Sequence, residues 1–158
     1  MGLTRINNQA LTDITSAGLP SGTVLQVKSA VIDGSDQNTS SSSFQASDIT
    51  LAITPSSASS KILVLVSTHA YCDNGIAGAI TIYKGSTNLA TYGTEYGMAR
   101  VYNTYGTWQS VHISHLDSPA TTNSTTYTVY WKNITGSNYV YLSQANNESS
   151  ITLMEIAG

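Results

Sequence analysis

The sequence predicts an all-β protein, built as an antiparallel β-sandwich or barrel. Apolar and polar residues alternate with a period of two along much of the chain, whereas helical periodicity is almost absent. Serine, threonine and asparagine supply 55 of the 158 residues, and charged residues only 9%. A neutral polar surface of this kind is typical of strands and loops, because helical surfaces favour charged residues and alanine. Turn signals separate about eight to ten expected strands.

The expected strands follow one another in a single domain that covers residues 23–158. They are residues 23–32, 48–54, 61–71, 78–85, 88–93, 107–117, 125–133, 138–144 and 149–158. The segments 78–85 and 88–93 are expected to form a hairpin, and the serine-rich segment 33–43 is expected to be a loop. Residues 1–22 carry irregularly spaced apolar residues, so we expect an arm that packs on the domain or attaches it to a partner.

Two of the expected strands, 61–71 and 149–158, are apolar on both faces. Successive side chains of a strand point to opposite faces, so each of these strands needs cover on two sides. The domain core covers one side, and either a neighbouring subunit or the arm 1–22 covers the other. The residues expected in the core or in a trimer interface are Leu63, Leu65, Ile151, Leu153, Met154 and Ile156.

Composition excludes several classes of function. The net charge is −3 and the six basic residues are scattered, which argues against nucleic-acid binding. No apolar run reaches the length of a membrane span or of a secretory signal, so we expect synthesis in a cytosol without membrane insertion. The single cysteine, Cys72, excludes an internal disulfide and is expected to be a small buried residue.

The residues able to do chemistry form no recognisable catalytic or metal-binding motif. His112 and His115 are three residues apart on an expected strand, which places them on opposite faces. His69 and Cys72 have the same spacing. The segment 33–38 is rich in oxygen ligands but lacks the glycine and glutamate positions of a calcium loop. We therefore expect no enzyme activity, cofactor or metal. The four Asn-x-Ser/Thr sequons are expected by chance in this composition.

Four segments, LPSGTVLQV (19–27), ITPSSASSKILVLV (53–66), LDSPATTNSTTYTVYW (116–131) and ITLMEIAG (151–158), resemble structural proteins of tailed bacteriophages, abundant among phages of cyanobacteria and other aquatic bacteria. In that group the unit forms the C-terminal head of tail fibres or a short free-standing virion protein. The resemblance covers about residues 19–158. It implies a jelly-roll sandwich, similar to complement and tumour-necrosis-factor heads, assembled as a homotrimer in which the last strand is buried on both faces.

A stretch rich in tyrosine is the candidate contact surface. Its aromatic residues are Tyr92, Tyr96, Tyr102, Tyr105 and Trp108, set among glycine, threonine and asparagine. Antibody contact loops have this composition, and flat rings also stack on sugars. Aromatic residues are equally strong strand formers, so the alternative is that these side chains line the core. For Tyr127 and Trp131, which alternate with Val129, we expect the core.

These observations together predict a non-enzymatic virion protein, assembled in the bacterial cytoplasm and located on the particle exterior. The first hypothesis is a homotrimeric short fibre or fibre head that contacts the host surface, with glycans as the expected ligand. The alternative is a capsid decoration or cement protein anchored by residues 1–22, which the short chain before the sandwich favours. A glycan depolymerase is a third hypothesis, but no carboxylate pair for such a reaction is evident.

Overall fold

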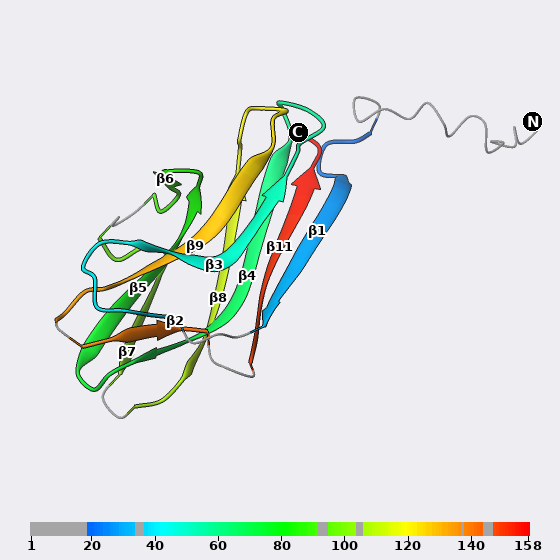
Figure 1. Cartoon of the computed structure of the whole chain (residues 1–158). Helices are drawn as coiled ribbons and strands as arrows, with labels where there is room; N and C mark the ends of the chain where they lie inside the picture. The colour runs from blue at the N-terminus through cyan, green and yellow to red at the C-terminus, as the bar shows by residue number, and fades with distance from the viewer. Residues whose placement is uncertain (1–18, 34–36, 92–94, 104–105, 137, 144–146) are drawn as a thin grey trace, which may run out of the picture.

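In the computed structural model, residues 19–33, 37–91, 95–103, 106–136, 138–143 and 147–158 are described (Figure 1). This part of the chain contains eleven β-strands and no helix, so none of it could cross a membrane as a helix. The strands are β1 (Val24–Asp33), β2 (Gln37–Thr39), β3 (Gln45–Ile53), β4 (Lys61–Cys72), β5 (Ile76–Lys84), β6 (Thr87–Asn88), β7 (Ala99–Asn103), β8 (Gln109–Asp117), β9 (Thr125–Asn133), β10 (Val140–Leu142) and β11 (Glu148–Ile156).

The strands form two sheets whose ladders are all antiparallel. Sheet A has the order β1, β11, β4 and β8, and sheet B has the order β3, β9 and β5 followed by β6 and β7. β10 pairs with β4 beyond the end of β11, on the same edge, and β2 pairs with β10. β6 and β7 pair with different parts of one edge of β5. The expectation of an all-β protein with antiparallel sheets is therefore confirmed.

The chain passes from one sheet to the other at six of the ten connections between the described strands. β2 of sheet A leads to β3 of sheet B, β4 returns to sheet A, and β5 lies in sheet B again. Consecutive strands share a sheet at β1–β2, at β5–β6–β7 and at β10–β11. β8 then joins sheet A, β9 sheet B, and β10 and β11 sheet A. Neighbouring strands in a sheet are consequently far apart in sequence, as in the central pair β4 and β11.

The hydrophobic core lies between the inner faces of the two sheets. Sheet A contributes alternate residues of β4 and β11, including Ile62 and Leu153, and sheet B contributes Ile82 and Tyr127, all fully buried. Trp131 is 4% exposed and its indole N–H donates to the carbonyl of Val140 in the other sheet. The predicted core positions of Tyr127 and Trp131 are thus confirmed.

The boundaries of three predicted segments were wrong. The predicted loop 33–43 contains β2, which pairs with β10. The expected strand 88–93 is reduced to β6, Thr87–Asn88, after which the edge of β5 pairs with β7 instead. β7 lies inside the tyrosine- and glycine-rich stretch, where no strand was predicted. Short edge strands of this kind carry too few residues for an alternating pattern to appear.

Gly78 on β5 is a point of close packing between the two sheets. A Cβ atom added there would lie 2.7 Å from Cγ1 of Val140 and 3.0 Å from Cγ2 of Val101. We expect Gly78→Ala to destabilise the fold by about 1–3 kcal/mol, because both valines are buried and must move. Urea denaturation measures the change. Gly136→Ala is the control, because a Cβ atom added there would lie 3.7 Å from Cδ1 of Ile76, an ordinary van der Waals distance. Equal losses in both variants would contradict the packing argument.

Candidate functional surfaces

The outer face of sheet A carries a row of apolar side chains that crosses four strands. Register places Val27 of β1 opposite Met154 of β11, Met154 opposite Leu63 of β4, and Leu63 opposite Leu116 of β8. Paired residues share a face, so these four side chains form one continuous line, called here the apolar row. Val27 is 54% exposed and Leu116 50% exposed. The row is therefore an apolar surface open to solvent in the single chain.

The residues next to the row are also apolar. Leu65 lies on the same face of β4, and Ile156, which pairs with Val24, ends β11 on that face. The strongly exposed aliphatic side chains among the described residues are Val24, Val27, Val31 and Leu116, and all four lie on this face. Ile151 and Leu153, by contrast, are fully buried in the core. The structure therefore divides the predicted interface or core residues into two core residues and four outer-face residues, Leu63, Leu65, Met154 and Ile156.

Beyond Leu65 the outer face of sheet A becomes hollow and polar. A shallow depression of about 290 Å³ is lined by Leu65, Ser67, His112, Ser114, Ser150 and Thr152, among others. Serine and threonine are shorter than the leucines of the apolar row, which accounts for the hollow. His112 is exposed here, while His115 lies half-buried on the opposite face of β8, as predicted.

An aromatic group, defined as Tyr71, Trp108, Tyr139 and Tyr141, occupies the other end of this face. The ring of Tyr71 lies 5.5 Å from those of Trp108 and Tyr141, and Tyr141 lies 6.1 Å from Tyr139. Tyr71 is eight residues from Leu63 along β4, about 26 Å at strand spacing. The outer face of sheet A thus has an apolar end, a polar hollow and an aromatic end.

The tyrosine-rich stretch does not form one surface in the described residues. Trp108 contacts Tyr71 on sheet A, whereas Tyr96 and Tyr102 lie beside the edge of sheet B and are 45% and 51% exposed. Neither tyrosine lines the core. Tyr92 and Tyr105 lie outside the described residues, as does part of the oxygen-rich segment 33–38.

The outer face of sheet B has a different character. Thr50 and Thr128 share a hydrogen bond of 2.8 Å across β3 and β9, and Thr126 is exposed. Tyr83 and Tyr130 stack at 4.0 Å between ring centroids, and Phe44 lies 6.0 Å from Tyr83. None of the strongly exposed aliphatic side chains of the described residues lies here. Sheet B therefore presents a hydroxyl and aromatic surface, which water solvates better than the apolar row.

The candidate nucleophile is held in an unreactive state. Cys72 is 1% exposed, and burial raises the pKa of its thiol to about 11. The thiolate is the nucleophilic form, so at neutral pH almost none is present. His69 lies on the outer face of β4 and Cys72 on the inner face, so the two side chains diverge. Among the described residues no three acidic, histidine or cysteine side chains gather to hold a metal ion.

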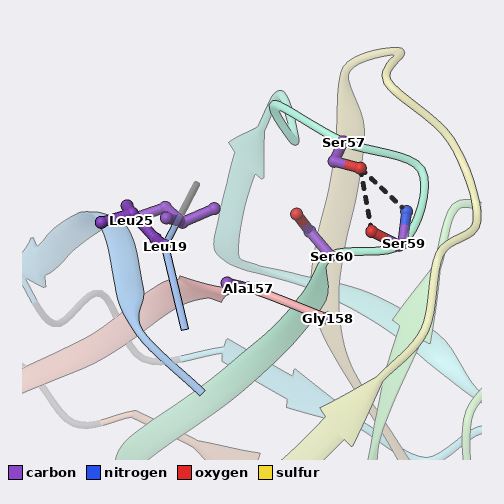
Figure 2. A pocket seen from close by; sticks show the side chains of 7 residues that line it. All are labelled: Leu19, Leu25, Ser57, Ser59, Ser60, Ala157 and Gly158. Atoms are coloured by element: carbon purple, nitrogen blue, oxygen red, sulfur yellow. Dashed lines mark hydrogen bonds between the residues drawn. The ribbon is translucent and has the colours of Figure 1, made fainter. Parts of the chain in front are cut away.

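A pocket of about 140 Å³ lies where the chain enters the sandwich next to its last residues (Figure 2). It is lined by Leu19, Leu25, Ser57, Ser59, Ser60, Ala157 and Gly158. Ser57 and Ser59 hydrogen-bond to each other at the rim. The lining has no titratable side chain, so these residues offer packing and hydroxyl contacts but no acid or base.

A buried carboxylate fixes the end of β11 near this pocket. Glu155 is fully buried, and its Oε1 accepts hydrogen bonds of 2.7 Å from both the backbone N–H and the hydroxyl of Ser56. Its Oε2 accepts from Nε2 of Gln26, which also donates to the carbonyl of Thr54. Burial alone would raise the pKa of Glu155, but these hydrogen bonds outweigh it and hold the pKa below its ordinary value.

We expect Glu155→Gln to cost about 1–3 kcal/mol at neutral pH, because the new amide N–H₂ would face the donor Nε2 of Gln26. The folded-state pKa of Glu155 is lowered, so its contribution to stability is present above the unfolded pKa of about 4.3 and is lost as pH falls through the folded value. The variant should therefore lose less stability than the parent on acidification. Urea denaturation between pH 7 and pH 3 tests this against Glu148→Gln, an exposed residue of the same strand; identical behaviour of both variants would contradict it.

Sequence reasoning missed several residues of these surfaces. Leu116 follows Ser110, His112 and Ser114 on the polar side of an alternating strand, and that single leucine was the available signal. Val27 was indistinguishable from other valines because β1 contains a bulge, at Leu25, that shifts the alternation. Tyr71 and Tyr141 come together only through the pairing of β4 with β10.

The sequence matches no protein-family model, and comparison with curated proteins finds no relative.

Proposed function

We propose that this protein is a homotrimeric jelly roll on the exterior of a bacteriophage particle, acting as a short fibre or fibre head that contacts the host surface. The observation that carries the proposal is the apolar row on the outer face of sheet A. The outer face of sheet B, by contrast, carries hydroxyl and aromatic side chains. The location on a bacteriophage particle is inferred from the sequence resemblance to phage fibre heads.

The strand order supports the jelly-roll assignment. A jelly roll of eight strands, folded as two Greek keys, has two four-stranded sheets. The orders β1, β11, β4, β8 and β3, β9, β5, β6/β7 correspond to these two sheets, with the short strand β2 as an addition at the edge of β10. β10 and β11 count as one interrupted strand in this scheme, as do β6 and β7, because each pair lines the same edge of one neighbour.

The size of the outer face of sheet A supports subunit contact. Four strands about 4.8 Å apart and about nine residues long cover roughly 19 by 30 Å, or about 570 Å². This is about seven tenths of the 800 Å² that each partner contributes to a typical stable interface. Complete burial of the half-exposed Val27 and Leu116 and of the partly buried Leu63 and Met154 would contribute a few kcal/mol per subunit. Aromatic residues and methionine are enriched in such interfaces, so we assign the aromatic group, including Trp108, to the same contact.

Binding rather than catalysis is the activity proposed. It is supported by the protonated Cys72, by the divergence of His69 from Cys72 and of His112 from His115, and by the hydroxyl-rich face of sheet B. With sheet A buried between subunits, sheet B and the exposed residues Tyr96 and Tyr102 form the surface offered to the host.

Immunogold electron microscopy of intact particles tests the location. Antibody raised against the purified protein is expected to label tail tips or fibres. Label spread over the head would favour the decoration-protein alternative. Absence of label on intact particles, with label after disruption, would contradict an exterior location of either kind.

A further inference from the structure

We propose that the outer face of sheet B binds an acidic glycan through a line of two basic and two aromatic side chains. This basic–aromatic row consists of Phe44, Lys132, Arg100 and Tyr96. The inference rests on the proposed function in one respect, because subunit contact through sheet A leaves sheet B exposed. It adds the chemical class of the ligand and the residues that bind it.

Register places the two cations in one line across the sheet. Ala79 of β5 pairs with Lys132 of β9 on one side and with Arg100 of β7 on the other. All three residues therefore share the outer face, and their Cα atoms span two strand spacings, about 10 Å. Ala79 itself carries only a methyl group and is fully buried, so the surface between the cations is formed by its neighbours. A ligand crossing β5 can thus reach both basic groups.

Each cation lies against an aromatic ring. Nζ of Lys132 is 4.8 Å from the centroid of Phe44, and Cζ of Arg100 is 5.4 Å from the centroid of Tyr96. Such contacts orient a cation without neutralising it. The stacked pair Tyr83 and Tyr130 continues the aromatic surface from Phe44.

The positive charge of the basic–aromatic row is not neutralised by ion pairs with described carboxylates. The ion pair found among the described residues joins Lys84 to Asp117, and neither Lys132 nor Arg100 lies within ion-pair distance of a described carboxylate. Asp48 is exposed on β3 of the same sheet, and Glu95 precedes Tyr96 in the sequence, but neither forms an ion pair with Lys132 or Arg100. In a chain of net charge −3, two basic side chains held without acidic partners favour an anionic ligand.

The side chains around the basic–aromatic row favour a carbohydrate over other anionic ligands. Two cations are too few for a nucleic-acid backbone, whose affinity grows with the number of phosphates neutralised. The neighbouring side chains are the hydroxyls of Thr50 and Thr128 and the rings of Tyr83 and Tyr130, which provide hydrogen bonds and flat contact area. A sugar with carboxylate groups uses all three features: rings, hydroxyls and cations.

Calorimetric titration of the full chain tests the proposal. The ligands are tetramers of galacturonate, guluronate and glucuronate, each also supplied with its carboxylates methyl-esterified, together with tetraglutamate as a non-sugar polyanion. At least one uronate tetramer should bind, and its esterified form should bind at least tenfold more weakly. Lys132→Gln and Arg100→Gln should each weaken binding about tenfold, the expected effect of one charge-assisted contact. Lys28→Gln on sheet A should leave it unchanged.

Three outcomes overturn the proposal: no uronate binds at millimolar concentration, the Lys132 and Arg100 variants bind like the parent, or tetraglutamate binds as tightly as the sugars. Light scattering on the same samples separates this proposal from the proposed assembly. A trimer that binds no uronate overturns the glycan site alone, whereas a monomer that binds one overturns the trimer alone.

Discussion

Leu63→Glu is expected to convert the proposed trimer into monomers of 16.7 kDa while leaving the β-fold intact. Leu63 lies in the middle of the apolar row, between Met154 and Leu116, and its side chain points away from the core. In the single chain a carboxylate at this position is solvated. In the assembly it would be buried among aliphatic groups with no partner, at a cost of several kcal/mol in each of three subunits.

Light scattering measures the mass, and circular dichroism of the same sample checks the fold. Thr126→Glu is the matched control, because it adds the same charge to the outer face of a central strand in sheet B, where no subunit contact is proposed. It should keep the mass of the parent. A Leu63→Glu protein with the parental mass would contradict the placement of the interface on sheet A.

Asp117→Ala is expected to lower the free energy of unfolding by about 3–5 kcal/mol. Asp117 is 8% exposed, accepts a 2.7 Å hydrogen bond from the hydroxyl of Tyr127, and forms a 3.0 Å ion pair with Lys84. Tyr127 is fully buried, so removal of the carboxylate leaves its hydroxyl without an acceptor inside the core and Lys84 without a counter-charge.

Urea denaturation at fixed protein concentration measures the loss, since stability of an oligomer depends on concentration. Tyr127→Phe, which removes the donor and leaves the ion pair, should cost only about 1 kcal/mol. Asp48→Ala, an exposed carboxylate on β3, should change stability by less than about 0.5 kcal/mol. Equal losses for Asp117→Ala and Asp48→Ala would show that the buried network contributes nothing.

The same network has a consequence at alkaline pH. Burial, followed by the hydrogen bond and negative charge of Asp117, raises the pKa of Tyr127. A raised folded-state pKa means that this contribution to stability is full below the unfolded pKa of about 10 and is lost as pH rises above it. Tyr127→Phe should therefore flatten part of the alkaline loss of stability in the same denaturation series.

Alternation carried most of the prediction of the fold. The long strands β8 and β9 alternate with a two-residue period, while β4 and β11 are apolar on both faces, and each of the four was predicted within a few residues of its bounds. The hairpin of β5 with β6 was predicted, although β6 is shorter than expected. The short strands β2 and β7 were not separable from loops, because their formation depends on an available edge of β10 or β5. That edge exists only in the assembled sheets.

The candidate surfaces were predictable only in part. An apolar outer face was evident from Met154 and Ile156, whose side of the last strand needed cover. The extent of the apolar row was not evident from the sequence, because Val27 and Leu116 join the row through strand pairing over long sequence separations. Lys132 and Arg100 likewise gave no signal, since nothing in their spacing indicates that Ala79 lies between them.

The native mass of the full chain in solution, measured by light scattering, tests the central claim most directly. The account predicts a mass close to three times 16.7 kDa, with the outer face of sheet A buried between subunits. A mass of 16.7 kDa at micromolar concentration would contradict the account. It would mean that another segment of the same chain, and not a second subunit, covers the apolar row.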